Sequence, residues 1–240
     1  MDILQRCVNV AKNALQFYKN LWVERSAGAY VALGCAAVVA LFVFFFILID
    51  YRRGGSRAMV RLLFSGLALV IAFLGTCIVG RAGIFDKSIG SIPFLKLEAF
   101  EPLLNAYFSA IVLPFVFCVA FLICNWLMGI PHGLICGILG FTYRRNNTIS
   151  RLAGALIGVF HGVFISIVLL LPCFALIKPY ADVAKKPSPD QAAAVSFYEN
   201  YLEDTAESPL YRYTMRFGGN KLLREIEEGN LADVVLDKLK

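Results

Sequence analysis

Four long apolar segments constrain this chain more than any other feature of its sequence. They cover residues 27–49, 58–80, 103–128 and 152–177. A helix rises about 1.5 Å per residue, so each segment is long enough to cross a hydrocarbon core about 30 Å thick. Hydrophobic residues make up 59% of the chain and the mean hydropathy is +0.69, both high for a soluble protein. We therefore predict an all-α protein, a polytopic membrane bundle of about four transmembrane helices.

The apolar segments divide the chain into three predicted parts. Residues 1–26 form an amphipathic helix that lies along the membrane interface or packs on the bundle, residues 27–177 form the transmembrane domain, and residues 178–240 form a polar, helical tail. The first apolar segment is too long for a cleaved signal, whose apolar region covers about 7–15 residues. In the tail, Ser208 and Pro209 are typical of a helix start. We expect the tail to dock on the membrane or on itself, or to stay partly disordered.

The third segment and the stretch that follows it are less regular. Pro114 is expected to kink the third span, and Asn125 is its one strongly polar side chain. Residues 129–142 are apolar but too few to cross a membrane independently, and they include Pro131 and His132. This stretch is predicted to be a broken extension of the third span, or an interfacial or re-entrant segment.

The distribution of arginines predicts the orientation of the chain in the membrane. Residues 50–57 are expected to form a short basic hairpin between the first two spans. Two groups of arginines flank the spans: Arg52, Arg53 and Arg57 in this hairpin, and Arg144, Arg145 and Arg151 before the fourth span. Positive charge favours the cytoplasmic side, so both groups are expected there. Both termini then lie on the opposite side of the membrane, outside the cytoplasm, although the basic residues of the first 26 positions oppose this orientation.

Four polar side chains stand out in or beside the spans: His161, Asn125, Arg61 and Asp50. An ionisable residue inside a membrane is by default a functional candidate. Against this, no second His, Asp or Glu lies in the middle of a span to form a proton relay with His161, so a structural hydrogen bond is the preferred interpretation. Arg61 is expected to extend towards the headgroups, with Asp50 as a possible partner.

The fourth span carries glycines at four-residue spacing, Gly154, Gly158 and Gly162. This spacing places them on one stripe of a helix, where another backbone can approach closely. We predict that the stripe packs against another helix of the bundle, or against another copy of the chain.

No catalytic motif, metal-ligand pattern or cofactor motif is found, and six of the seven cysteines lie in apolar runs. The basic residues occur in short clusters and do not form a face with interleaved aromatic residues, so nucleic acid is not an expected partner. The expected partners are the lipid bilayer and either further copies of the chain or other membrane proteins. We predict no enzyme activity, no cofactor and no metal site.

Two stretches resemble the colicin V production protein (CvpA) family: the Arg-Gly-Gly-Ser-Arg entry at residues 53–57 and the start of the fourth span at residues 149–162. The resemblance covers roughly residues 30–215. It implies an inner-membrane protein linked to toxin production or export and to envelope maintenance. The chain departs from the family in its additional N-terminal helix, its longer tail, and the position of Asp50 at the end rather than the start of the first span.

Two functions remain open at this point. The first is a non-catalytic scaffold or accessory factor in toxin export and envelope homeostasis. The alternative is a channel or transporter subunit, in which glycine-rich helices of several copies line a pore with His161 and Asn125 as polar contacts. An enzyme that acts on lipid or peptide has the least support.

Overall fold

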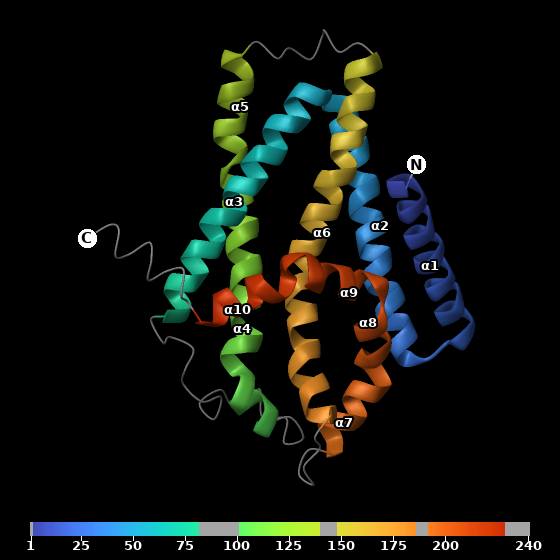
Figure 1. The fold of residues 1–240 in the computed structure, drawn as a ribbon. Coiled ribbons are helices and arrows are strands. Elements are labelled where there is room, and N and C mark those ends of the chain that lie inside the picture. The colour runs from blue at the N-terminus through green and yellow to red at the C-terminus, as the bar shows by residue number, and fades with distance from the viewer. Residues whose placement is uncertain (1, 82–100, 140–147, 186–191, 229–240) are drawn as a thin grey trace. The chain divides into compact units, whose positions relative to one another are not determined.

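The computed structural model describes residues 2–81, 101–139, 148–185 and 192–228, and all of its regular elements in these ranges are helices (Figure 1). Four stretches are long and apolar enough to cross a membrane: Ala27–Arg53, Gly55–Gly80, Val112–Ile138 and Thr148–Lys185. The all-helical prediction with four candidate spans is therefore confirmed.

The chain divides into two compact units. The first comprises Met1–Ala37, Ser88–Phe108 and Cys173–Lys221, and the second comprises Val38–Lys87, Ser109–Pro172 and Leu222–Lys240. The second unit holds the larger part of the candidate spans and is described first.

Helices α2 (Ala27–Arg53) and α3 (Gly55–Arg81) meet at a single residue. Gly54 has a φ of 79°, a left-handed conformation that commonly ends a helix. Arg52 and Arg53 occupy the last turn of α2, where positive charge complements the helix dipole. The expectation of a polar hairpin beginning at Asp50 is therefore wrong: Asp50 belongs to the helix and is fully buried.

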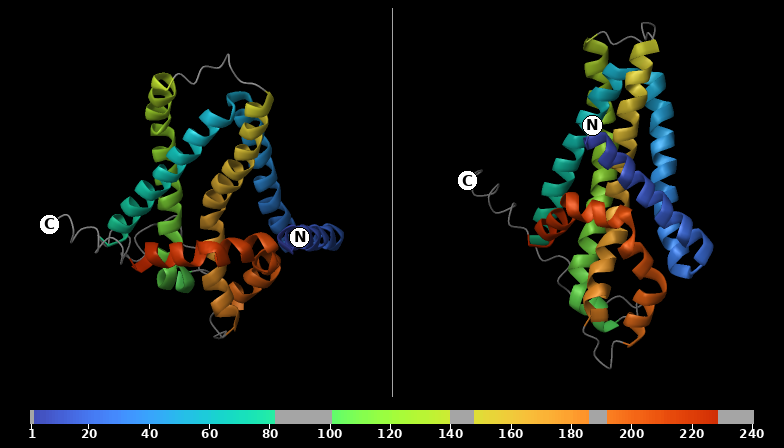
Figure 2. Two further views of the ribbon diagram at one scale, coloured as in Figure 1. Left: turned by 45° about the horizontal axis from the view of Figure 1, so that its top comes forward. Right: turned by 45° about the vertical axis from the view of Figure 1, so that its right-hand side comes forward.

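Helices α4 (Glu101–Leu127) and α5 (Gly129–Ile138) follow each other end to end, as both views of Figure 2 show. Helical hydrogen bonds continue across the junction, since the Met128 amide donates to the Cys124 carbonyl at 2.9 Å and the His132 amide to the Met128 carbonyl at 3.2 Å. Among the predicted alternatives for this stretch, residues 129–138 thus form an extension of the third span, and residues 140–142 lie outside the described part of the chain. Helix α4 also continues through Pro114.

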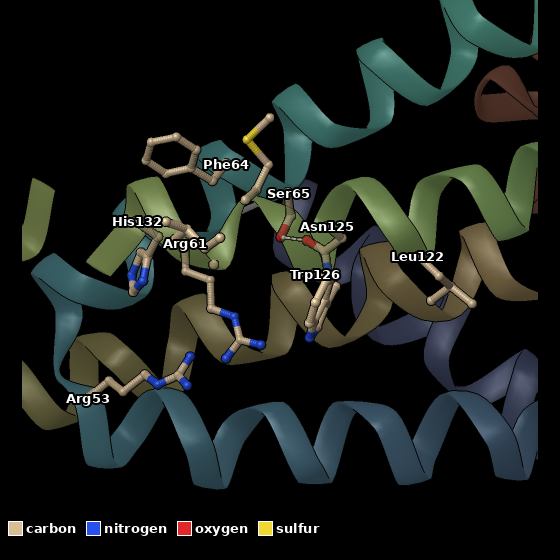
Figure 3. A pocket seen from close by; sticks show the side chains of 11 residues that line it. Arg53, Arg61, Phe64, Ser65, Leu122, Asn125, Trp126 and His132 are labelled. Atoms are coloured by element: carbon tan, nitrogen blue, oxygen red, sulfur yellow. Dashed lines mark hydrogen bonds between the residues drawn. The ribbon is translucent and has the colours of Figure 1, made fainter. Parts of the chain in front are cut away.

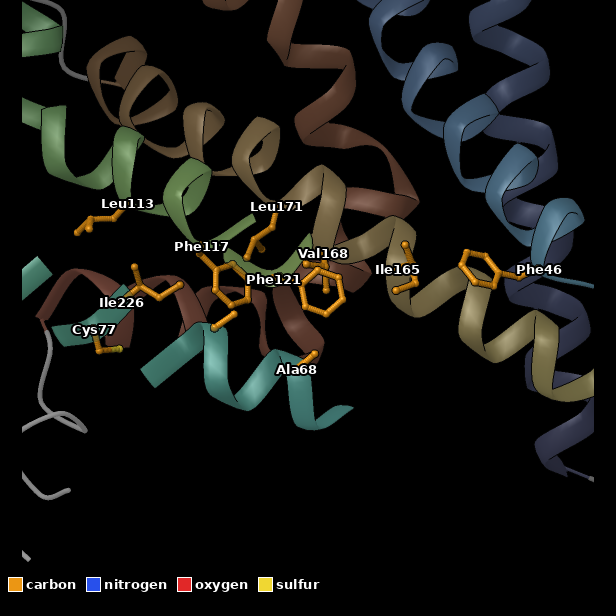
Figure 4. Close-up of a cluster of buried hydrophobic side chains, with 11 residues drawn as sticks. Phe46, Ala68, Cys77, Leu113, Phe117, Phe121, Ile165, Val168, Leu171 and Ile226 are labelled. Carbon is orange, nitrogen blue, oxygen red and sulfur yellow. The ribbon is translucent and has the colours of Figure 1, made fainter. Parts of the chain in front are cut away.

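The core of the second unit is apolar and brings α3, α4, α6 (Thr148–Lys185) and α10 (Asn220–Glu228) together (Figure 4). Phe117 and Phe121 of α4 are fully buried in it. Cys77 of α3 and Ile226 of α10 complete one end of the cluster. Helix α10 therefore has an apolar side, at Leu222, Leu223 and Ile226, that packs on the spans of this unit.

The first unit joins the remaining tail helices to the beginning of α2. Ser26 caps α2 by accepting a hydrogen bond from the Ala29 amide at 2.9 Å, and its hydroxyl donates to Asp204 of α8 (Glu203–Glu207) at 2.9 Å. Gly28 allows this approach, because a Cβ there would lie 2.6 Å from the Asp204 carboxylate. The tail thus docks on a span, which the sequence did not predict.

In the rest of the tail, α9 (Pro209–Thr214) begins at the expected signal. Helix α7 (Ala192–Phe197) leads through the π-helical turn η5 (Tyr198–Leu202) into α8, and α9 continues through η6 (Met215–Gly219) to α10. Ser208 caps α9 by accepting from the Tyr211 amide at 3.2 Å, with proline in the first turn. Burial raises the pKa of the Tyr211 phenol, so this ring stays neutral in its edge-on contact with Phe174.

The described packing contacts of helix α1 (Asp2–Glu24) lie in its last turns. Leu21 is buried with Ala29 and Ala32 of α2, while Leu15 and Trp22 are 74% and 68% exposed. Exposed apolar and aromatic side chains of this kind suit a helix that lies in a membrane interface.

Candidate functional site

The three glycines of α6 form a contact surface for the backbone of α2. A Cβ on Gly158 would lie 2.6 Å from the Phe46 carbonyl oxygen, and one on Gly162 would lie 2.5 Å from the Val43 Cα. A Cβ on Gly154 would overlap the Asp50 carbonyl oxygen. The glycine stripe therefore lets the backbones of α6 and α2 touch within the second unit. Their separation leaves no room for a Cβ atom at these positions.

This close approach buries an ionisable pair. Nδ1 of His161 on α6 lies 3.1 Å from Oδ2 of Asp50 on α2, and both side chains are 0% exposed. The pair lies beside the glycine stripe, because His161 precedes Gly162 and the Asp50 carbonyl faces Gly154. An isolated charge would be very costly at this position, so each group requires the other.

A hydrogen-bonded chain extends from the pair through two more helices. Ser65 of α3 lies 3.0 Å from His161 Nε2, and its hydroxyl donates to Asn125 Oδ1 of α4 at 2.8 Å. The Ser65 hydroxyl has one proton and gives it to Asn125, so Nε2 of His161 is the donor to Ser65. One further proton then lies between His161 Nδ1 and Asp50, and the pair has no net charge whichever residue carries it.

The neighbouring arginine is placed differently from the prediction. The guanidinium of Arg61 lies over the Phe46 ring, 5.4 Å from its centroid. Phe46 in turn packs on the His161 ring, with 4.3 Å between the two ring centroids. Asp50 therefore has His161 as its partner, not Arg61 as proposed from the sequence. Among the described residues, Arg61 Nη1 and Asp50 Oδ1 are buried atoms without a hydrogen-bond partner.

The polar chain ends at a cavity of about 560 Å³ in the second unit (Figure 3). Ser65 and Asn125 line it together with Arg53, Arg61 and His132, which gather at one end. A second cavity of about 440 Å³ shares Arg53 and His132 with the first. His132 therefore has a place at the site, although its sequence position between Pro131 and Gly133 carried no functional signal.

The structure thus brings together most of the polar residues selected from the sequence. Asp50, His161 and Asn125 form one chain and Arg61 lies beside it, while Ser65, the residue that links them, was missed because a serine in an apolar span is common. The arginines predicted to set the topology are found at the α2–α3 junction and at the start of α6, where Arg151 is exposed; Arg144 and Arg145 lie outside the described residues.

The start of α6 lies next to the α2–α3 junction. The Gly55 amide donates to the Ser150 hydroxyl at 3.2 Å, and a Cβ on Gly55 would lie 3.0 Å from that of Ala153. Arg52, Arg53, Arg57 and Arg151 therefore lie at the same end of the second unit.

Within the described ranges, no three His, Cys, Asp or Glu side chains cluster in a way that could hold a metal ion. Comparison with models of protein families, with curated proteins and with solved structures finds no match. The resemblance to the colicin V production protein family stays a prediction.

Proposed function

We propose that this chain is a non-catalytic protein of the bacterial cytoplasmic membrane, a scaffold or accessory factor of the kind that the family resemblance implies for toxin export and envelope maintenance. The observation that carries the proposal is the contact between α6 and α2. It uses the glycine stripe for packing within the chain, and it directs the Asp50–His161 pair away from solvent, since both side chains are 0% exposed. A buried pair of this kind fixes which helices meet and in what register.

The proposed orientation places the arginine-rich end of the second unit in the cytoplasm and both termini outside. It is supported by the proximity of Arg52, Arg53, Arg57 and Arg151, because four basic side chains at one end of a set of spans favour the cytoplasmic side. The proposed partners are the lipid bilayer, and other membrane proteins or further copies of the chain on the exposed apolar faces of the spans.

A second candidate, a transporter subunit, is favoured by one observation: the chain of hydrogen bonds from Asp50 reaches a cavity through Ser65 and Asn125. Such a chain is a route for a proton between the cavity and the buried pair. A pore lined by glycine-rich helices from several copies has less support than a transporter subunit of this kind. The reason is that α2 of the same chain already covers the glycine stripe.

Reconstitution of the full chain into liposomes tests the choice between the two. We expect proton flux, followed with an entrapped pH dye, and single-channel conductance to equal those of protein-free vesicles. His161→Ala serves as the matched variant. Flux that the intact chain supports and His161→Ala abolishes would replace the scaffold with the transporter.

A further inference from the structure

Basic side chains are concentrated in the lining of the two cavities of the second unit. Arg53, Arg61 and His132 line the larger cavity, and Arg52 and Arg57 join Arg53 and His132 in the smaller one. Among the described residues that line the two cavities there is no aspartate or glutamate. Nη1 of Arg61 is buried without a hydrogen-bond partner in the described part of the chain. The chemistry of this lining therefore suits an anion.

The histidine at this position is held in place. Its Nε2 lies 3.4 Å from the Arg57 carbonyl oxygen, which can only accept a hydrogen bond, so Nε2 carries a proton and His132 connects α5 to α3. Phe64 contacts the same ring edge-on with centroids 6.4 Å apart. The basic end of the cavity is thus formed by side chains from three helices, α2, α3 and α5.

The other side of the larger cavity is apolar and open to the surroundings. Leu122, Trp126 and Ile130 line it at four-residue spacing along the continuous α4–α5 helix, and they are 45%, 77% and 66% exposed. On a helix, residues four apart lie one above the other. These three side chains form an apolar strip that leads away from the arginines along the outside of a candidate span.

We propose that the larger cavity binds the phosphate headgroup of an anionic phospholipid, with an acyl chain along the strip of Leu122, Trp126 and Ile130. A volume of about 560 Å³ is large enough for a headgroup. The arginine pair matches the phosphate, since guanidinium groups bind phosphate oxygens in a two-pronged geometry. Basic pockets between spans at the cytoplasmic side are typical sites for anionic headgroups. A soluble phosphate shares the headgroup chemistry but leaves the apolar strip without a function.

Quenching of tryptophan fluorescence by brominated lipids measures this binding directly. The chain has two tryptophans, so the variant Trp22→Phe leaves Trp126, which lines the cavity, as the reporter. The full chain is reconstituted in phosphatidylcholine with increasing fractions of brominated phosphatidylglycerol, and in a parallel series with brominated phosphatidylcholine. The buffer contains about 0.15 M salt, which screens the general attraction between the basic protein surface and anionic lipid beyond roughly 8 Å. We expect half-maximal quenching at a several-fold lower fraction of the anionic lipid than of the neutral lipid.

Variants and a soluble competitor identify the binding groups. Arg53→Gln combined with Arg61→Gln is expected to abolish the several-fold preference for the anionic lipid, because each arginine contributes roughly fivefold. Arg151→Gln, at an exposed arginine that lines neither cavity, is expected to leave the preference unchanged. Inorganic phosphate at matched ionic strength is expected not to relieve the quenching.

Each contrary result overturns the proposal. Equal quenching by the two lipids in the Trp22→Phe protein excludes a selective site without recourse to the arginine variants, which matters if those variants do not fold. Relief of quenching by inorganic phosphate would assign the cavity to a soluble phosphate compound. An effect of Arg151→Gln as large as that of the double variant would show general attraction of lipid to a basic surface.

Discussion

Replacing Gly158 with leucine is expected to separate α2 from α6 and to prevent recovery of a monodisperse protein in detergent. Even one added carbon at this position would lie 2.6 Å from the Phe46 carbonyl oxygen and 2.9 Å from the Ile47 Cα, and backbone atoms cannot move aside as a flexible side chain can. Gly158→Ala is therefore expected to destabilise the protein by at least about 1–3 kcal/mol, the usual cost of overpacking. Size-exclusion profiles and reversible unfolding in mixed micelles measure both effects.

The matched control is Gly66→Ala on α3. A Cβ on Gly66 meets nothing within 4 Å, so this variant is expected to be neutral, or to stabilise its helix by up to about 1 kcal/mol. The stripe would have no packing role if Gly158→Ala unfolded at the same denaturant concentration as Gly66→Ala.

Removing one member of the Asp50–His161 pair is expected to cost about 3–5 kcal/mol, because the remaining group is left buried without its partner. The double variant, Asp50→Ala with His161→Ala, is expected to be destabilised by much less than the sum of the two single variants. An ordinary hydrogen bond between membrane helices contributes about 0.6–2 kcal/mol, so a larger coupling energy indicates a pair that compensates charge. A double-mutant cycle in the same unfolding assay gives this energy.

Ser166→Ala provides the comparison for this cycle. Ser166 is also fully buried on α6, but its hydroxyl donates to the Gly162 carbonyl of its own helix at 2.6 Å. Its loss leaves no unpaired charge and is expected to cost about 1 kcal/mol. Additive effects of the Asp50 and His161 variants, each no larger than that of Ser166→Ala, would contradict the account of the pair.

The elements that the sequence predicted well are those set by local patterns. The four spans follow from uninterrupted apolar length, and Ser208 with Pro209 marks a helix start because a capping hydroxyl and a residue without an amide proton suit the first turn. The glycine stripe, too, could be found from its spacing. Its occupant could not, because the backbone of α2 that contacts it is more than 100 residues away in the sequence.

The expected hairpin at residues 50–57 shows why the candidate site was missed. Asp50 precedes Tyr51, two arginines and two glycines, a composition typical of a turn, and this placed the carboxylate outside the membrane core. In the structure, the arginines instead suit the last turn of α2, and Gly54 alone reverses the chain. Because α2 continues for one more turn, Asp50 points inward to His161. From the sequence, a proton relay was excluded because His161 had no ionisable neighbour, and Asp50 is that neighbour.

The cavity and its arginines depend on tertiary structure in the same way. The sequence identified Arg53 only as a topology signal and Arg61 as a residue that extends to the headgroups. Their convergence with His132 depends on the continuation of α4 into α5, which the short apolar run after Met128 left undecided. Charge that is predicted to set the orientation of the chain is thus also available to bind an anion.

The buried pair of Asp50 on α2 and His161 on α6 can be tested by a dipolar contact measured with solid-state NMR in lipid bilayers. The chain has two histidines, so ¹⁵N-labelled histidine with His132→Gln leaves the signals of His161 alone. With ¹³C in the carboxyl groups of aspartate, we expect magnetisation transfer from Nδ1 to one carboxyl carbon, consistent with the 3.1 Å nitrogen-to-oxygen distance. Asp50→Asn should remove this transfer. A His161 ring that shows no such transfer, and whose nitrogen protons exchange freely with water, would contradict the account.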